Sequence, residues 1–170
     1  MAHNFVVERG IDPDIPWHIN LELRAGELQA IGHVCAQWAA TEQLMRDHSF
    51  FLCEFASINP PQNIDNDSFV RRKRIWAELA ERSFANHPNE LASVKAVIDR
   101  VGSMESERNI VIHSLFKWDT ANKYRLKAHS RKNPNNVPRR LNRKRIEKTA
   151  QKIAILNFDI LALHSGIEFV

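Results

Sequence analysis

The side chains best suited to chemistry in this sequence lie in one stretch, from Glu105 to Phe116. Asn109 and His113 are four residues apart, so in a helix they share a face, and the long stem of Arg108 can reach the same place. An imidazole can exchange a proton with a ribose 2′-hydroxyl or a leaving oxygen near neutral pH, and a guanidinium can stabilise charge that develops on phosphorus. The three residue types therefore predict phosphoryl-transfer chemistry that requires no metal ion and no cofactor.

The same stretch interrupts the apolar face of a long predicted helix. Apolar residues recur at helical spacing on both sides of the interruption, at Leu91, Val94, Ile98, Val101, Ile112 and Leu115. Glu105 and Arg108 fall where this face continues, and an unpaired charge is costly to bury. We therefore expect them to pair, to reach a ligand, or to line a wet cleft or an interface. Glu105, or Glu42 from an earlier helix, could orient Arg108, although Glu42 could equally reach solvent.

The pattern of apolar residues and helix breakers predicts the elements that must position these side chains. Helices are expected over about residues 24–55, 69–85, 89–116 and 140–164, and alternation over 123–129 predicts a strand or hairpin. Residues 1–23 form an irregular lead-in, 118–122 a turn and 130–138 a mobile basic loop. The expected fold is all-α, a single domain over residues 1–170. It is a helical bundle of about four main helices, with a short β-hairpin or strand insertion before the last one.

The composition indicates an ordinary globular protein. The chain has 170 residues, of which 44% are hydrophobic and 26% charged, which suits one domain with a real core. No segment resembles an export signal or a run of 18 apolar residues, so we expect a cytoplasmic protein with no membrane partner. Cys35 and Cys53 lie about 27 Å apart if both are on one helix, too far to form a disulfide. Both are expected to be reduced, small core residues.

Positive charge is concentrated in one segment. Residues 123–148 contain eleven Lys or Arg and the single acid Glu147, a net charge of +10, while the whole chain is only +4. The remainder is therefore −6, and a basic segment on an acidic body suggests a polyanion partner such as RNA. The candidate nucleic-acid-binding residues are Lys123, Arg125, Lys127, Arg131, Lys132, Arg139, Arg140, Arg143, Lys144 and Arg145.

The segment Arg108-Asn109-Ile-Val-Ile-His113-Ser resembles the Arg-x4-6-His motif of HEPN domains. The first helix with Trp38 and Glu42, and the final amphipathic helix, extend this resemblance to small bacterial HEPN-like proteins over roughly residues 24–164. The resemblance implies a metal-independent endoribonuclease in which Arg108, Asn109 and His113 are catalytic. It also implies a homodimer, because two motifs usually form one composite cleft in this family. One departure is Phe116, where relatives often have tryptophan.

Three functions remain open on this basis. The first is an HEPN-type endoribonuclease, as a toxin or defence effector with a cognate antitoxin as a candidate partner, that leaves 2′,3′-cyclic phosphate ends. The second is a non-catalytic helical module that binds RNA or a partner protein through the basic segment. The third is a dimeric interaction protein in which Arg108 forms a structural ion pair and His113 is a packing residue.

Overall fold

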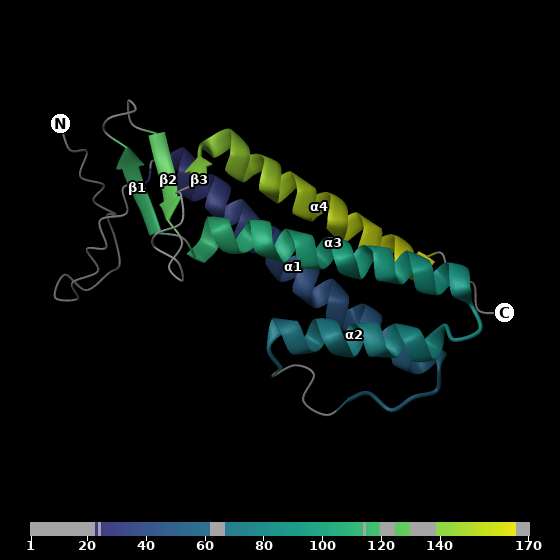
Figure 1. Cartoon of the computed structure of the whole chain (residues 1–170). Coiled ribbons are helices and arrows are strands. Elements are labelled where there is room, and N and C mark those ends of the chain that lie inside the picture. The colour runs from purple at the N-terminus through teal and green to yellow at the C-terminus, as the bar shows by residue number, and fades with distance from the viewer. Residues whose placement is uncertain are drawn as a thin grey trace, which may run out of the picture.

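The computed structural model describes residues 23, 25–61, 67–113, 115–119, 125–129 and 139–165. Four helices make up most of this part of the chain: α1 (Ala25–Phe55), α2 (Phe69–Ser83), α3 (Pro88–His113) and α4 (Arg143–Ser165). They pack as a bundle in which α1 lies against α4, and α2 covers the second half of α1 (Figure 1). The predicted all-α bundle of four main helices is confirmed. The predicted lead-in, apart from Leu23, and the loop at 130–138 lie outside the described residues.

Local sequence explains where the helices begin. The side chain of Ser68 accepts a hydrogen bond from the backbone N–H of Arg71 and so caps α2. α3 starts at Pro88, where the missing N–H of proline costs nothing because the first amides of a helix lack partners. α4 follows Asn142, whose side chain accepts from the amide of Arg145.

A small antiparallel sheet lies at one end of the bundle, beside the start of α1 and α4 and the end of α3 (Figure 1). Its strands are β1 (Leu115–Asp119), β2 (Arg125–His129) and β3 (Arg139–Leu141), in the order β1-β2-β3. A short β-hairpin or strand before the last helix was expected, but a sheet of three strands was not. Two predicted boundaries are therefore wrong: α3 ends at His113 rather than Phe116, and α4 starts at Arg143 rather than Arg140. Pairing between strands decides both, and helical periodicity does not report it.

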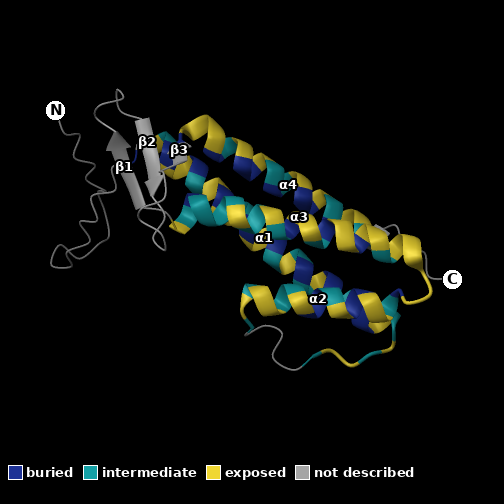
Figure 2. Ribbon diagram, viewed as in Figure 1, coloured by how far each residue is buried: buried dark blue, intermediate teal, exposed yellow. Residues whose placement is uncertain are grey.

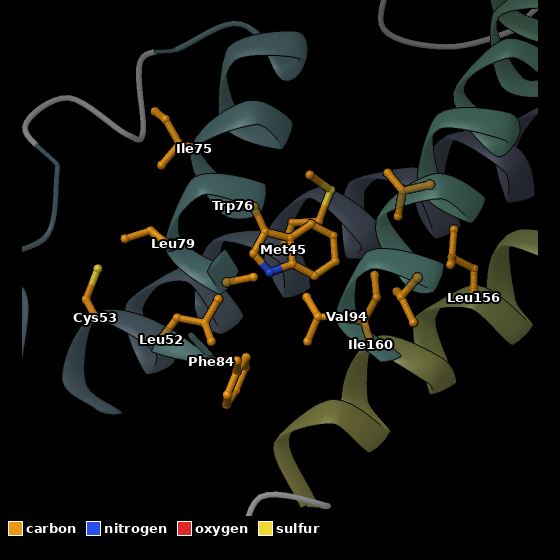
Figure 3. Packing of buried hydrophobic residues seen from close by; sticks show 13 residues of the cluster. Met45, Leu52, Cys53, Ile75, Trp76, Leu79, Phe84, Val94, Leu156 and Ile160 are labelled. Carbon is orange, nitrogen blue, oxygen red and sulfur yellow. The ribbon is translucent and has the colours of Figure 1, made fainter. Parts of the chain in front are cut away.

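Two large clusters along the bundle form most of the core of the described residues, and Leu23 and Leu141 form a small third one. One surrounds Trp76 and is built from α1, α2, α3 and α4 (Figure 3). The other, nearer the sheet, contains Trp38 from α1, Val111 from α3 and Ile146 and Ile153 from α4. Exposed residues cover the outer surfaces of the helices (Figure 2). None of the described helices is both long and apolar enough to cross a membrane.

Buried polar groups connect α1 to α4. The hydroxyl of Thr41 lies 2.6 Å from Oδ1 of Asn157, and Nδ2 of Asn157 donates to the carbonyl and the side-chain oxygen of Gln37 at 3.0 and 3.1 Å. Thr41 and Asn157 are both buried, so these bonds satisfy groups that would otherwise be costly to bury.

The prediction that both cysteines are core residues is wrong for Cys35, which is exposed, and right for Cys53; neither forms a disulfide. The buried face of α1 follows Ala30, Val34 and Trp38, whereas Leu28 is 40% exposed. Small and polar residues such as Ala30 and Thr41 occupy the centre of this face. Helical spacing of large apolar residues therefore selects Cys35 in place of its buried neighbour Val34.

Thiol reactivity should distinguish the two cysteines. Burial raises the pKa of the Cys53 thiol, which lowers its thiolate fraction at neutral pH, and packing also blocks access. We expect iodoacetamide to alkylate Cys53 at least about tenfold more slowly than Cys35 in the folded protein. Mass spectrometry of peptides over a time course measures both rates. Cys35→Ser should leave only the slow reaction, and equal rates in the native protein would contradict this burial.

Candidate functional site

Arg108 lies on the buried side of α3, between Val101 and Val111 of the core. Its guanidinium carbon is 5.5 Å from the centre of the Trp38 ring, within the range of a cation–π interaction. Its Nε is buried and has no hydrogen-bond partner among the described residues. Among the described residues, an aromatic face holds this cation and no carboxylate pairs with it, so the outer nitrogens of the guanidinium can donate to uncharged groups.

The same guanidinium connects the other two predicted residues. Nη1 of Arg108 donates to Oδ1 of Asn109 at 2.9 Å and lies 3.0 Å from Nε2 of His113. Arg108 and His113 are about 140° apart around the helix axis, and the arginine stem bridges this angle. The structure thus brings all three side chains together, as the spacing predicted.

The hydrogen bond to Arg108 defines the tautomer of His113. A guanidinium has only donors, so Nε2 of His113 must be the acceptor, and a neutral imidazole then carries its proton on Nδ1. His113 is the last residue of α3 and is exposed. The imidazole therefore lies at a place that a large ligand can reach.

Glu42 does not contact Arg108, contrary to one of the two roles expected for it. Its Oε1 accepts from the indole nitrogen of Trp38 at 2.7 Å, and its Oε2 pairs with Nη2 of Arg72 at 2.5 Å. Phe69 also packs against the Trp38 ring, and the two ring centres are 5.0 Å apart. Glu42 therefore acts on Arg108 indirectly, because it orients the ring on which the guanidinium rests.

Glu105 likewise pairs elsewhere. Its Oε2 lies 3.0 Å from Nζ of Lys73 on α2, and both side chains are about three-quarters buried. The expectation that Glu105 pairs with or orients Arg108 is wrong, because a cation from the neighbouring helix reaches this carboxylate first. Of the outcomes expected for Glu105, which were to pair, to reach a ligand, or to line a cleft or an interface, the structure shows pairing.

Two cations that sequence reasoning did not select thus hold the acids of this site. Arg72 and Lys73 belong to the basic run at the start of α2, which could be expected to lie in solvent or to bind phosphate. The helical repeat separates its members: Arg71 and Arg74 pair locally with Asp67 and Glu78, while Arg72 and Lys73 bridge to α1 and α3. Apolar residues flank this basic run, at Phe69 and Ile75. They could have indicated that some of its cations face the interior of the bundle.

The candidate nucleic-acid-binding residues have varied positions. Arg125, Lys127, Arg139 and Arg140 lie on β2 and β3, while Arg143, Lys144 and Arg145 form the exposed first turn of α4. Lys123, Arg131 and Lys132 lie outside the described residues. Lys127 is in register with Lys117 of β1 and Arg140 of β3, so three basic residues stand opposite one another across the sheet.

In the part of the chain that the structure describes, no three His, Cys, Asp or Glu residues gather closely enough to hold a metal ion. Comparison with protein-family models, curated proteins and solved structures found no match for this chain. The fold defines an all-α helical bundle, and its candidate site rests on the residues themselves.

Proposed function

We propose that this protein is a metal-independent endoribonuclease of the HEPN type. The observation that carries the proposal is the convergence of Arg108 and His113, whose side-chain nitrogens lie 3.0 Å apart at the exposed end of α3. A cation and a neutral imidazole in one accessible place are the two groups that cleavage at a ribose phosphate needs. The resemblance of this segment to the Arg-x4-6-His motif supports the same assignment.

The proposed reaction starts when a phosphate of the RNA binds the guanidinium of Arg108. This contact replaces the hydrogen bond to His113 and frees Nε2 to take the proton of the 2′-hydroxyl. The 2′-oxygen then bonds to phosphorus, the bond from phosphorus to the 5′-oxygen breaks, and water supplies the proton that the departing oxygen takes. The hydroxide that remains takes the proton from His113, which restores the neutral imidazole. Asn109 holds the guanidinium in place, and the products are a 2′,3′-cyclic phosphate and a 5′-hydroxyl.

The wider setting belongs to the same proposal. Two copies of the chain would form a homodimer whose motifs share one composite cleft, and the basic residues from Lys123 to Lys148 would supply RNA affinity that falls with added salt. The biological role would be that of a toxin or defence effector in the cytoplasm, with a cognate antitoxin as its inhibitor.

The first experiment is to incubate the purified protein with mixed structured and unstructured RNA in the presence of EDTA. Fragments that carry 2′,3′-cyclic phosphate and 5′-hydroxyl ends are expected, because no step uses a metal ion. RNA that stays intact over hours, or fragments with 3′-hydroxyl ends, would contradict the proposal.

A second candidate is a non-catalytic module that binds RNA through its basic face. The matched positions of Lys117, Lys127 and Arg140 across the sheet favour it, because they would bind phosphates whether or not the RNA is cut. RNA binding that weakens steeply with salt, without any cleavage, would support this function over the first.

Trp38 should affect cleavage through Arg108. Trp38→Leu removes the aromatic face under the guanidinium, an interaction that is worth about 1–2 kcal/mol when partly desolvated, so turnover should fall by about five- to thirtyfold. Trp38→Phe keeps a ring but loses the bond to Glu42, and should show a smaller loss. Single-turnover rates at saturating RNA measure the effect.

Phe69→Leu provides the matched control for this prediction. Phe69 packs against Trp38, so its replacement disturbs the same packing and removes a contact with Lys73, but it leaves the Trp38 ring under the guanidinium of Arg108. Equal losses in the Trp38 and Phe69 variants would show that only packing matters. A normal rate in Trp38→Leu would exclude the proposed role of the ring.

A further inference from the structure

An open cleft of about 380 Å³ lies beside the last turns of α3. The end of α3, β3 and the first turns of α4 enclose it. Ile110, Val111 and Leu141 provide apolar lining. Its volume is in the range of sites that hold small molecules or one unit of a polymer.

Cations from α4 form one wall of this cleft. Arg145, Lys148 and Lys152 are spaced three and four residues apart, so they lie in a row along one face of the helix. Lys152 is paired with Glu107, at 2.8 and 3.1 Å from its two carboxylate oxygens. Lys148 is exposed and forms no ion pair with any other described residue. With Glu107 as the one acid in the lining, the cleft keeps a net positive charge.

The cleft is close to the proposed catalytic residues. Glu107 and Ile110, which line it, are the sequence neighbours of Arg108 and Asn109, and neighbouring residues are about 100° apart around a helix axis. At a helix radius of about 5 Å this angle corresponds to a path of roughly 9 Å over the helix surface. A ligand in the cleft that continues as a chain can therefore reach the end of α3.

We propose that this cleft binds the sugar-phosphate backbone of single-stranded RNA beside the cleavage site. Arg145 and Lys148 contact phosphates, and the apolar lining of Ile110, Val111 and Leu141 accommodates a ribose or base. Grooves that combine cations with apolar contact surface are the usual way of holding single strands without reading their sequence. The choice of RNA as ligand rests on the proposed function.

The test uses Lys148→Glu in the full chain that also carries His113→Ala, so that RNA is bound but not cut. Binding of a fluorescent single-stranded oligoribonucleotide is followed by anisotropy over a range of salt concentrations. The Lys148→Glu change should weaken binding at least about tenfold and lower the slope of log affinity against log salt by about 0.7, the value for one phosphate contact.

Arg82→Glu is the matched control, because it makes the same charge change at the end of α2, at the opposite end of the bundle from the sheet (Figure 1). It should bind nearly as tightly as the parent. If both variants weakened RNA binding equally, the effect would come from the net charge of the protein, and the proposal would be wrong. Unchanged binding by Lys148→Glu, no RNA binding at low salt, or displacement of the RNA by polyglutamate at equal charge concentration would also overturn it.

The outcome is independent of cleavage. One possible result is that the protein with an intact His113 cuts no RNA, while Lys148→Glu weakens RNA binding more than Arg82→Glu does. This result would support the proposed cleft and contradict the catalytic proposal. The opposite result is that the protein with both His113 and Lys148 intact cuts RNA, while RNA binding does not depend on Lys148. This result would support the catalytic proposal and contradict the proposed cleft.

Discussion

His113→Ala is expected to lower the rate of RNA cleavage by about a hundred- to ten-thousandfold, the usual contribution of a positioned general base. Arg108→Ala should cost about a hundred- to a thousandfold, because it removes the charge that stabilises the pentacoordinate phosphorus. Arg108→Lys should recover little, since an ammonium cannot bridge to Asn109, His113 and a phosphate as the planar guanidinium does. Single-turnover cleavage of a labelled RNA measures all three rates.

The chain contains its own matched control for these variants. Arg82 and His87 have the same separation of five residues as Arg108 and His113, but α2 ends between them, at Ser83. Arg82→Ala and His87→Ala should therefore cut RNA at nearly the parental rate. Circular dichroism and thermal unfolding show whether every variant is folded. Cleavage that persists in a folded His113→Ala protein would remove the imidazole from the mechanism.

Trp76→Ala is expected to lower the free energy of unfolding by about 3–5 kcal/mol, the usual cost of removing a large buried aromatic side chain. Trp76 is completely buried at the centre of the cluster formed by all four helices (Figure 3). For a chain of this size the loss corresponds to a fall in Tm of roughly 6–20 °C. Calorimetry or thermal circular dichroism measures it.

Two further variants separate packing from hydrogen bonding at this position. The indole nitrogen of Trp76 donates to Nδ1 of buried His48 at 2.7 Å. Trp76→Phe keeps most of the apolar contact but leaves this acceptor unsatisfied, which should cost about 1–3 kcal/mol. Val70→Ala on the same helix, at a residue that is 63% exposed, should change stability by less than about 0.5 kcal/mol. If Trp76→Ala were as mild as Val70→Ala, the cluster would not be a core.

Periodicity was sufficient to predict most of the fold. The helices around Val94 and Trp38 were placed correctly because large apolar residues recur every three or four positions without an intervening proline. Periodicity wrongly assigned Cys35 to the core. The buried face of α1 contains Ala30 and Thr41, which are small or polar and contribute little to a hydrophobic pattern. Periodicity also missed β3, since a strand of three residues depends on a partner that is distant in sequence.

The site was predictable where it depends on one helix and unpredictable where it depends on several. Arg108, Asn109 and His113 come together because they share the last turns of α3, and their spacing alone allowed this. Which cation meets Glu42 or Glu105 is decided by how α2 lies across α1 and α3. Local patterns contain no information about that geometry, so Arg108, the partner suggested for both carboxylates, is not the cation that either of them meets.

The amide of Asn157 has a consequence for how reproducibly the protein assembles. Two helices that meet only through interchangeable aliphatic side chains can fit together in several alignments, offset by a turn, at similar free energy. A turn of displacement between α1 and α4 would strip Asn157 of its bonds to Gln37 and Thr41 in a dry interior. The cost of leaving this amide without partners therefore favours one alignment of α1 and α4. A polar residue at the helix interface of a coiled coil fixes the alignment of its helices in the same way. The start of α4, with its run of cations, thereby keeps a constant position relative to Trp38 and the guanidinium that rests on it.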